Sequence, residues 1–149
     1  MSMASAEPPA QRAFILYVDT SALLKLLVRE AESTAIEAEL VQWPNLATSV
    51  VTEVELPRAV ARARAERPEA VIDESLILQG VIASAAIIEL SEDIVTAARN
   101  VEPIHVGALD SIHIASALSL GPELAGVATY DHRMADALTR AHVNVIAPA

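Results

Sequence analysis

Phe14-Ile15-Leu16-Tyr17-Val18-Asp19 is the segment from which the architecture of this chain can be inferred. Its first five residues form a continuous apolar run rich in branched and aromatic side chains, which is typical of a strand buried on both faces of a sheet. Thr20 or Ser21 can then cap a following helix. Because ligands of open α/β sheets bind beyond the carboxyl ends of the strands, Asp19 is a candidate functional residue.

Helical patterns and short apolar segments alternate along the rest of the chain. This alternation predicts an α/β fold with a central parallel sheet and helices on both faces. Residues 1–12 are small, polar and proline-containing, and they indicate a disordered leader before one domain over 13–149. We expect helices from Thr20 or Ser21, over 32–41, from Ser49 with a kink at Pro57, and over 69–80, 91–101 and 109–120, with further strands near 46–48, within 81–90, at 126–129 and at 143–146.

The composition excludes several classes of protein. The 149 residues include no cysteine, hence no disulfide and no thiolate zinc site. The apolar runs are too short to span a membrane and no export signal is visible, so we expect a cytoplasmic protein. Dinucleotide-binding, P-loop and serine-hydrolase motifs are all missing from the sequence.

The net charge of −10 argues against a broad electrostatic grip on nucleic acid, because such binding depends on many lysine and arginine contacts to phosphates. Any polyanion that binds must therefore be held by a local cluster of basic residues. The arginines that could do so are concentrated at Arg58, Arg62, Arg64 and Arg67, a spacing that gives a partly one-sided basic patch on a helix. A solvated helix face is the alternative interpretation of this cluster.

Four acidic stretches lie in apolar surroundings, around Asp19, Glu53–Glu55, Asp110 and Asp131. Taken singly, each acid has an ordinary interpretation as a cap, a first-turn acid or a turn residue. Taken together, each has a hydroxyl residue close by in sequence. Two like charges about 4 Å apart repel by roughly 4 kcal/mol at an effective dielectric near 20, so convergence would require protons, paired cations or a metal. Such oxygen donors suit Mg²⁺ or Mn²⁺.

The histidines do not form a metal-binding pattern among themselves. His105, His132 and His142 lack the spacing of zinc ligands. His113 lies one turn beyond Asp110, where it is either a metal ligand, a general base or a hydrogen-bonded support, and the support role is the commonest for such a residue.

Four motifs in the same order resemble those of PIN-domain nucleases, and most closely those of VapC toxins from VapBC toxin–antitoxin systems. They cover about Leu16 to Pro148. The motifs are Tyr-Val-Asp-Thr-Ser-Ala-Leu-Leu-Lys at 17–25, Ser-x-Val-x-x-x-Glu-Leu-x-Arg-Ala at 49–59, Leu-Asp-Ser-Ile-His-Ile-Ala-Ser-Ala-Leu at 109–118 and Ala-Thr-Tyr-Asp-x-Arg-Met at 128–134. The family often has an arginine just before Leu-Asp, whereas this chain has His105-Val106-Gly107-Ala108.

The resemblance implies a three-layer α/β/α endoribonuclease that depends on Mg²⁺ or Mn²⁺, forms a homodimer and is neutralised by a VapB-type antitoxin. The metal ligands and catalytic residues would be Asp19, Glu55, Asp110 and Asp131, supported by Thr20, Ser21, Thr129 and His113. Arg58 and Arg62 would contact the RNA backbone. Glu55 is preferred to Glu53 because it stands directly before Leu-x-Arg-Ala, and Asp93 is interpreted as a first-turn helix acid.

Two alternatives come from other functional classes. A receiver-like signalling module also places acids at strand ends, but it requires a late lysine, and no lysine follows Lys25. A PIN domain kept only for binding is less consistent with four intact acids. The dimer prediction rests on the many Leu, Val and Ile residues of 21–28 and 32–41, which exceed the apolar stripe that a monomer requires.

Overall fold

The computed structural model describes residues 14–149, except for the side chains of 76–78. Five strands form one sheet in the order β3-β2-β1-β4-β5, and every neighbouring pair is parallel. The strands are β1 (Ile15–Val18), β2 (Leu46–Ser49), β3 (Ala86–Ile88), β4 (Leu124–Ala128) and β5 (Val145–Ile146). The predicted parallel α/β sheet is therefore confirmed.

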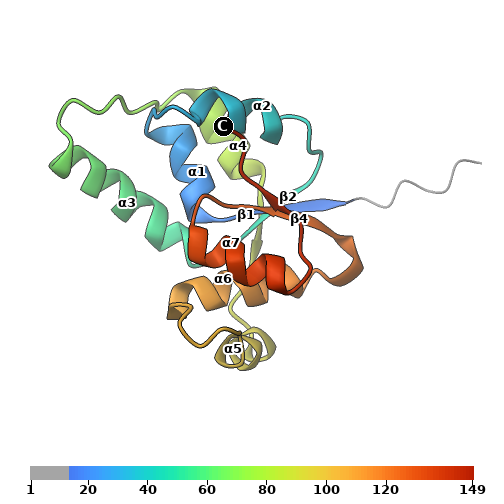
Figure 1. Cartoon of the computed structure of the whole chain (residues 1–149). Helices are drawn as coiled ribbons and strands as arrows, with labels where there is room; N and C mark the ends of the chain where they lie inside the picture. Colours follow the sequence, from blue (N-terminus) through green and yellow to red (C-terminus); the bar gives the residue numbers. More distant parts are fainter. Residues whose placement is uncertain (1–13) are drawn as a thin grey trace, which may run out of the picture.

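Helices cover both faces of this sheet, which gives the expected three layers (Figure 1). One layer contains α1 (Thr20–Leu27), α2 (Ser33–Leu40) and α4 (Leu76–Ser84), and the other contains α6 (Ala108–Leu118) and α7 (His132–Arg140), with α5 (Glu92–Arg99) packed on α6. Helix α3 (Thr52–Glu66) follows β2 and extends outward from the edge where the strands end. A short 3₁₀ turn, η1 (Gly121–Glu123), precedes β4.

The central strand divides the core in two because its side chains alternate between the faces. Leu16 and Val18 pack on one face in a cluster with residues of α1 and α2, whereas Tyr17 packs on the other with residues of α6 and α7. All three are fully buried. The apolar run thus predicted the environment of Leu16–Val18 correctly, whereas Phe14 precedes β1 and is 50% exposed.

The apolar side chains of α1 and α2 are largely used inside the monomer. Leu23, Leu26, Ile36 and Leu40 are buried, and Val41 is the exposed large hydrophobic residue at the end of α2. These two helices therefore do not expose the excess of apolar side chains that the sequence suggested for a dimer interface.

Several predicted boundaries were wrong. Helix α3 begins at Thr52 and not at Ser49, because Ser49 still pairs with Ile88 in the sheet. Pro57 lies inside this helix as predicted, and the kink expected there stays a prediction. The helix expected over 69–80 starts only at Leu76, since Ile72 forms an isolated bridge with Val28. The proposed leader at 1–12 lies outside the described residues.

Helix α7 was not anticipated from the sequence, which suggested only a turn after Asp131. Asp131 caps this helix by accepting a hydrogen bond from the backbone N–H of Met134 at 2.9 Å. In the described part of the chain, no helix has the length and apolar character needed to cross a membrane.

The strand order places the end of β1 at a switch point. From β1 the sheet grows through β2 and β3 to one side, and through β4 and β5 to the other. The backbone N–H of Asp19 bonds the carbonyl of Ala128 at 3.1 Å, so the ends of β1 and β4 lie side by side. A crevice for ligands is expected where the order reverses in this way.

Candidate active site

Asp19 follows β1 directly and is 2% exposed. Its Oδ1 accepts hydrogen bonds from the Ser21 hydroxyl at 2.7 Å and from the Ala22 backbone N–H at 3.1 Å, and its Oδ2 accepts one from Thr129 at 2.8 Å. Burial raises the pKa of Asp19 above its ordinary value, although these donors oppose the rise. The fold therefore holds this carboxylate in a fixed orientation at a cost in desolvation.

Glu55 reaches the same region from the first turns of α3. Its Oε1 accepts a hydrogen bond from the Thr20 hydroxyl at 2.9 Å and lies 2.6 Å from His113 Nε2. Burial acts to raise the pKa of Glu55, but the contacts with His113 and Thr20 outweigh it and lower the pKa. Glu55 is thus kept ionised. Glu53, the alternative acid, is exposed and makes no contact with this group among the described residues.

His113 is buried on α6 and links Glu55 to the core. Its Nδ1 lies 2.6 Å from the Tyr17 hydroxyl, and its ring stands edge-on to Tyr17. Burial strongly raises the pKa of Tyr17, so its hydroxyl stays protonated while it is hydrogen-bonded to Nδ1. The other ring nitrogen, Nε2, is the one that faces the Glu55 carboxylate. His113 has the supporting position that the sequence favoured.

Asp110 and Asp131 complete the group from the other side of the crevice. Asp110 lies in the first turn of α6 and is partly buried, and Asp131 caps α7. Burial raises the pKa of Asp110, and the charges of Asp131, Asp19 and Glu55 raise it further, opposed by His113. Four acids from four segments therefore share one electrostatic environment.

The donor set of this crevice fits a hard divalent cation. Its acids supply oxygen atoms only, and their mutual repulsion is what a cation relieves. As the side chains stand, no three acidic or histidine side chains within the described residues are gathered closely enough to hold a metal ion. Binding of a cation would therefore require the acidic side chains to move closer together.

The remaining predicted residues lie around this crevice. Thr20, Ser21 and Thr129 bond the acids directly, and Thr129 also accepts the N–H of Asp131 at 3.1 Å. Arg58 and Arg62 are exposed on α3, three and seven residues beyond Glu55, and hence on the same side of that helix. Asp93 is exposed in the first turn of α5, next to the Ser91 cap, as expected for a helix acid.

Comparison with known proteins shows the family of this chain. The family model described as "PIN domain" matches residues 16–138. The chain belongs to the PIN-domain family. Among curated members, it is 35% identical to Ribonuclease VapC47 of Mycobacterium tuberculosis over 128 residues, which are 80% of this chain and 87% of that protein. It is 33% identical to Ribonuclease VapC46 of the same species, over 90% of this chain and 98% of the relative.

Solved structures show the same PIN fold at low sequence identity. A toxin–antitoxin complex from Klebsiella pneumoniae has a chain with a TM-score of 0.61 and 19% identity, covering 90% of this chain and 98% of that chain. M. tuberculosis VapC20, described as a toxin that cleaves the sarcin–ricin loop, has a TM-score of 0.59 and 14% identity, with 82% and 94% covered.

Sequence reasoning missed Tyr17 as a member of the site. A hydroxyl in a strand buried on both faces needs a partner, because a buried polar group without one is costly. Tyr17 is such a residue, two positions before Asp19. The partner could not be identified from sequence, since His113 is 96 residues away.

Proposed function

We propose that this PIN-domain protein is a Mg²⁺- or Mn²⁺-dependent endoribonuclease and the toxin of a toxin–antitoxin pair. The observation that supports it most is the shared environment of Asp19, Glu55, Asp110 and Asp131 at the switch point of the sheet, where Asp110 is affected by the charges of the other three. The curated relatives are named ribonucleases. PIN-domain ribonucleases generally depend on divalent metals.

In this mechanism, Asp19, Asp110, Asp131 and Glu55 would hold the metal. A bound cation would supply water activation and charge stabilisation at the scissile phosphate. Ser21 and Thr129 fix both oxygens of Asp19, and Thr20 and His113 fix Glu55. Preorganised ligands of this kind avoid a reorganisation cost during the reaction.

Arg58 and Arg62 would contact RNA phosphates next to the crevice. They are exposed and, among the described residues, have no ion pair. The other two arginines of the cluster are already paired, Arg64 with Glu74 and Arg67 with Glu30. This difference singles out the pair that lies on the Glu55 side of α3. An enzyme with this substrate would act in the cytoplasm.

The decisive experiment replaces Asp110, which has no hydrogen-bonded side-chain partner among the residues that the structure describes. Asp110→Asn should abolish cleavage of a single-stranded RNA in Mg²⁺ or Mn²⁺. It should also raise the melting temperature of the metal-free protein, because it removes a carboxylate whose pKa is raised by burial and by like charges. Asp19→Asn should abolish cleavage without this gain, since Asp19 also accepts three hydrogen bonds.

Two controls make the experiment specific. Asp93→Asn changes an exposed acid that, like Asp110, lies in the first turn of a helix, and it should leave cleavage unchanged. Wild-type cleavage should stop in excess EDTA and return with added Mg²⁺ or Mn²⁺. Retained cleavage by purified Asp110→Asn and Asp19→Asn, or cleavage that persists in EDTA, would refute the proposed function.

A VapB-type antitoxin would bind the apolar groove between α1, α3 and α4. The groove has a volume of about 450 Å³ and begins beside the site, since Leu56 follows Glu55 directly. An apolar helix suits such a groove, and an arginine beyond its end could reach the carboxylates. The chain's net charge of −10 favours a basic partner segment.

Two alanines of α3 offer a matched test of the antitoxin site. Ala61 lines the groove, whereas Ala65 is exposed one turn further along and does not. Ala61→Glu should prevent co-purification with the protein encoded beside this gene, and Ala65→Glu should not. Equal binding by both variants would exclude this groove, and failure of that neighbour to suppress wild-type cleavage would exclude it as the antitoxin.

A further inference from the structure

A second hollow lies away from the antitoxin groove, between α7 and the loop that leads into α6. It has a volume of about 320 Å³ and is lined by Pro103, His105, Val106, Arg133, Asp136 and Arg140. Nothing in the catalytic arrangement described above uses these side chains.

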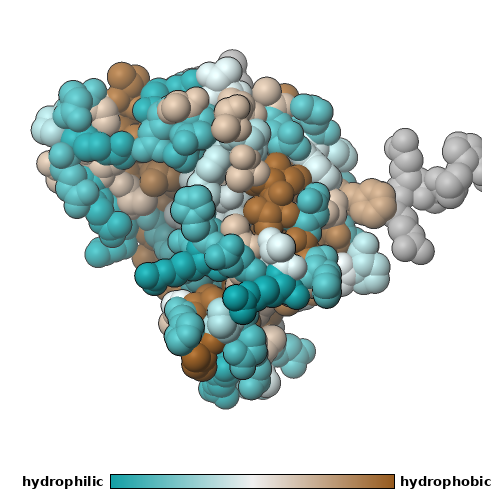
Figure 2. Space-filling model, in the orientation of Figure 1, coloured by the Kyte–Doolittle hydropathy of each residue, from teal (hydrophilic) through white to brown (hydrophobic). Residues whose placement is uncertain are grey.

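Two arginines and one aspartate line this hollow, so its basic charge exceeds its acidic charge. Arg133, Asp136 and Arg140 lie on one side of α7, because they are spaced by three and four residues. Both arginines are exposed, and neither has an ion pair within the described residues, although carboxylates are abundant in a chain with a net charge of −10. Figure 2 shows the most hydrophilic residues of that face gathered along and just below α7.

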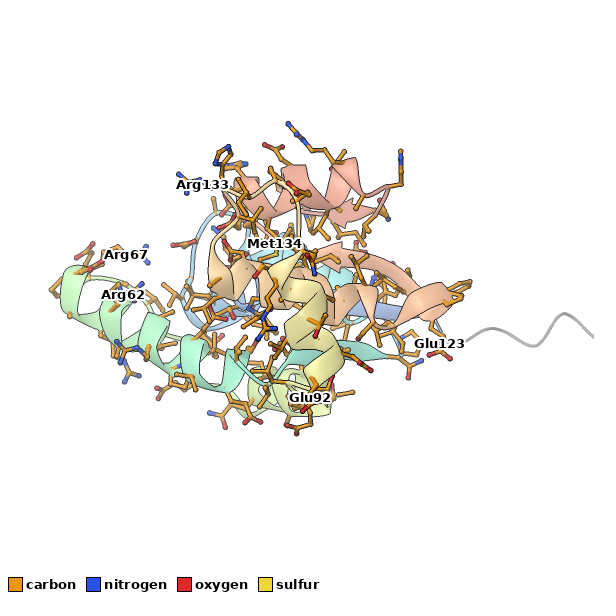
Figure 3. The ribbon with its side chains drawn as sticks, turned by 90° about the horizontal axis from the view of Figure 1, so that it is seen from below. Arg62, Arg67, Glu92, Glu123, Arg133 and Met134 are labelled. Atoms are coloured by element: carbon orange, nitrogen blue, oxygen red, sulfur yellow. The ribbon has the colours of Figure 1, made fainter. Side chains whose placement is uncertain are left out.

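The two walls of the hollow are close in sequence to two acids of the site. Arg133 stands two residues after Asp131, in the first turn of α7. On the other wall, His105 and Val106 lead into Gly107, which caps α6, and Asp110 follows in the first turn. Figures 1 and 3 both place the start of α7 on the same side of the molecule as α3, and Figure 3 labels Arg133 and Arg62 there.

We propose that Arg133, Arg140 and His105 form a subsite for backbone phosphates of the RNA strand, on the α7 side of the scissile bond. This inference rests on the proposed ribonuclease function and adds a binding path to it. A strand that contacts Arg58 and Arg62 on α3 passes the four acids and leaves over α7. Two basic flanks hold it in place while the acids between them repel phosphates.

The position of the hollow favours RNA over an acidic protein segment. Guanidinium groups bind both phosphates and carboxylates bidentately, so the position of the hollow decides between the two. Any strand lying across Asp110 and Asp131 must meet the first turn of α7 or the loop at 103–106. The arginines of α7 supply guanidinium groups at this position.

The test measures RNA binding without cleavage. A fluorescent single-stranded RNA is titrated with full-length protein in EDTA at several salt concentrations. Arg133→Ala and Arg140→Ala should each weaken binding several-fold and reduce the slope of log K against log salt by about 0.7, as expected when one phosphate contact to a single strand is removed. Arg99→Ala, which removes an exposed charge at the end of α5 outside the hollow, is the matched control and should change neither quantity beyond error.

The outcomes separate this inference from the proposed function. Wild-type protein that binds and cleaves RNA, with the slope unchanged in both arginine variants, overturns the subsite alone. Wild-type protein that neither binds nor cleaves RNA overturns both. If the variants lose binding to poly-glutamate but bind RNA as tightly as wild type, the hollow belongs to an acidic protein segment and the subsite is refuted.

Discussion

Among single residues, the two acids at the start of α3 differ sharply in their surroundings. Glu55 is bonded by Thr20 and His113, whereas Glu53 is exposed. We expect Glu55→Gln to reduce RNA cleavage by at least two orders of magnitude, because an amide is a poor metal ligand. Glu53→Gln should have little effect. Steady-state cleavage assays in Mg²⁺ decide between them, and a reversed order would show that Glu53 is the acid of the second motif.

The Tyr17 hydroxyl is a positioning group that acts on Glu55 through His113. Tyr17→Phe leaves Nδ1 of a buried histidine without its hydrogen-bond partner, which costs about 1–3 kcal/mol. We expect kcat to fall about tenfold with KM unchanged, and Mn²⁺ binding to the resting protein, measured by calorimetry, to weaken.

The matched control for Tyr17→Phe is Tyr130→Phe. It also removes a hydroxyl, one that donates to the carbonyl of Pro148 at 2.6 Å and is not bonded to the site histidine. Both variants should lose thermal stability, but only Tyr17→Phe should lose kcat and Mn²⁺ affinity. Equal loss of activity in the two variants would show that Tyr17 contributes only through packing.

Among the helices, α1 is linked by ion pairs of Lys25 to the segment that leads into α2. The Nζ of Lys25 lies 2.5 Å from Glu30 and 3.0 Å from Glu32, and 5.0 Å from the centre of the Tyr130 ring. Burial acts to lower the pKa of Lys25, but the two glutamates raise it. Hydrogen bonding to Lys25 in turn lowers the pKa of both glutamates.

These shifts define the pH range of the stabilisation. The lowered pKa of the glutamates adds stability at pH values above their ordinary pKa of 4.5, and this stability is lost as the pH falls. The raised pKa of Lys25 adds stability that is lost only as the pH rises past 10.5. Lys25→Met should therefore lower the melting temperature at pH 7 by a few degrees, and by progressively less below about pH 4. Arg62→Met removes a cation that has no ion pair among the described residues, and it should show no such pH dependence.

For the whole molecule, we expect a two-fold homodimer at micromolar concentration. With α1 and α2 largely buried, the apolar surface lies elsewhere: Val54 on α3 is 63% exposed, and Ile87 and Leu90 at the open sheet edge are 39% and 45% exposed. Exposed sheet edges and apolar side chains are commonly covered by a partner. Light scattering of the purified protein tests the assembly.

Two valines test which surface pairs. Val54→Asp should shift the protein towards monomer, and Val41→Asp, at the end of α2, should leave the dimer intact. A wild-type protein that scatters as a monomer contradicts the assembly itself. A dimer broken only by Val41→Asp would show that the interface lies on α1 and α2, as the sequence suggested.

Sequence alone was sufficient to identify the strand that ends at Asp19, the parallel α/β class and the four acidic motifs. Local signals are enough for these features: an unbroken apolar run means burial on both faces, and acids beside hydroxyl residues mark the strand ends and helix starts. Glu55 was also preferred to Glu53 from its place in a motif.

The contacts of these acids, in contrast, depend on the tertiary structure. Tyr17, His113 and Glu55 come from β1, α6 and α3, and their hydrogen bonds require packing between segments up to 96 residues apart. Helix α7 also became clear only in the tertiary structure, because an aspartate such as Asp131 can begin either a turn or a helix. The hollow that Arg133 and His105 share likewise depends on tertiary packing. Local patterns specify elements, whereas the strand order brings their ends together, and this order is fixed by the packing of two cores on one sheet.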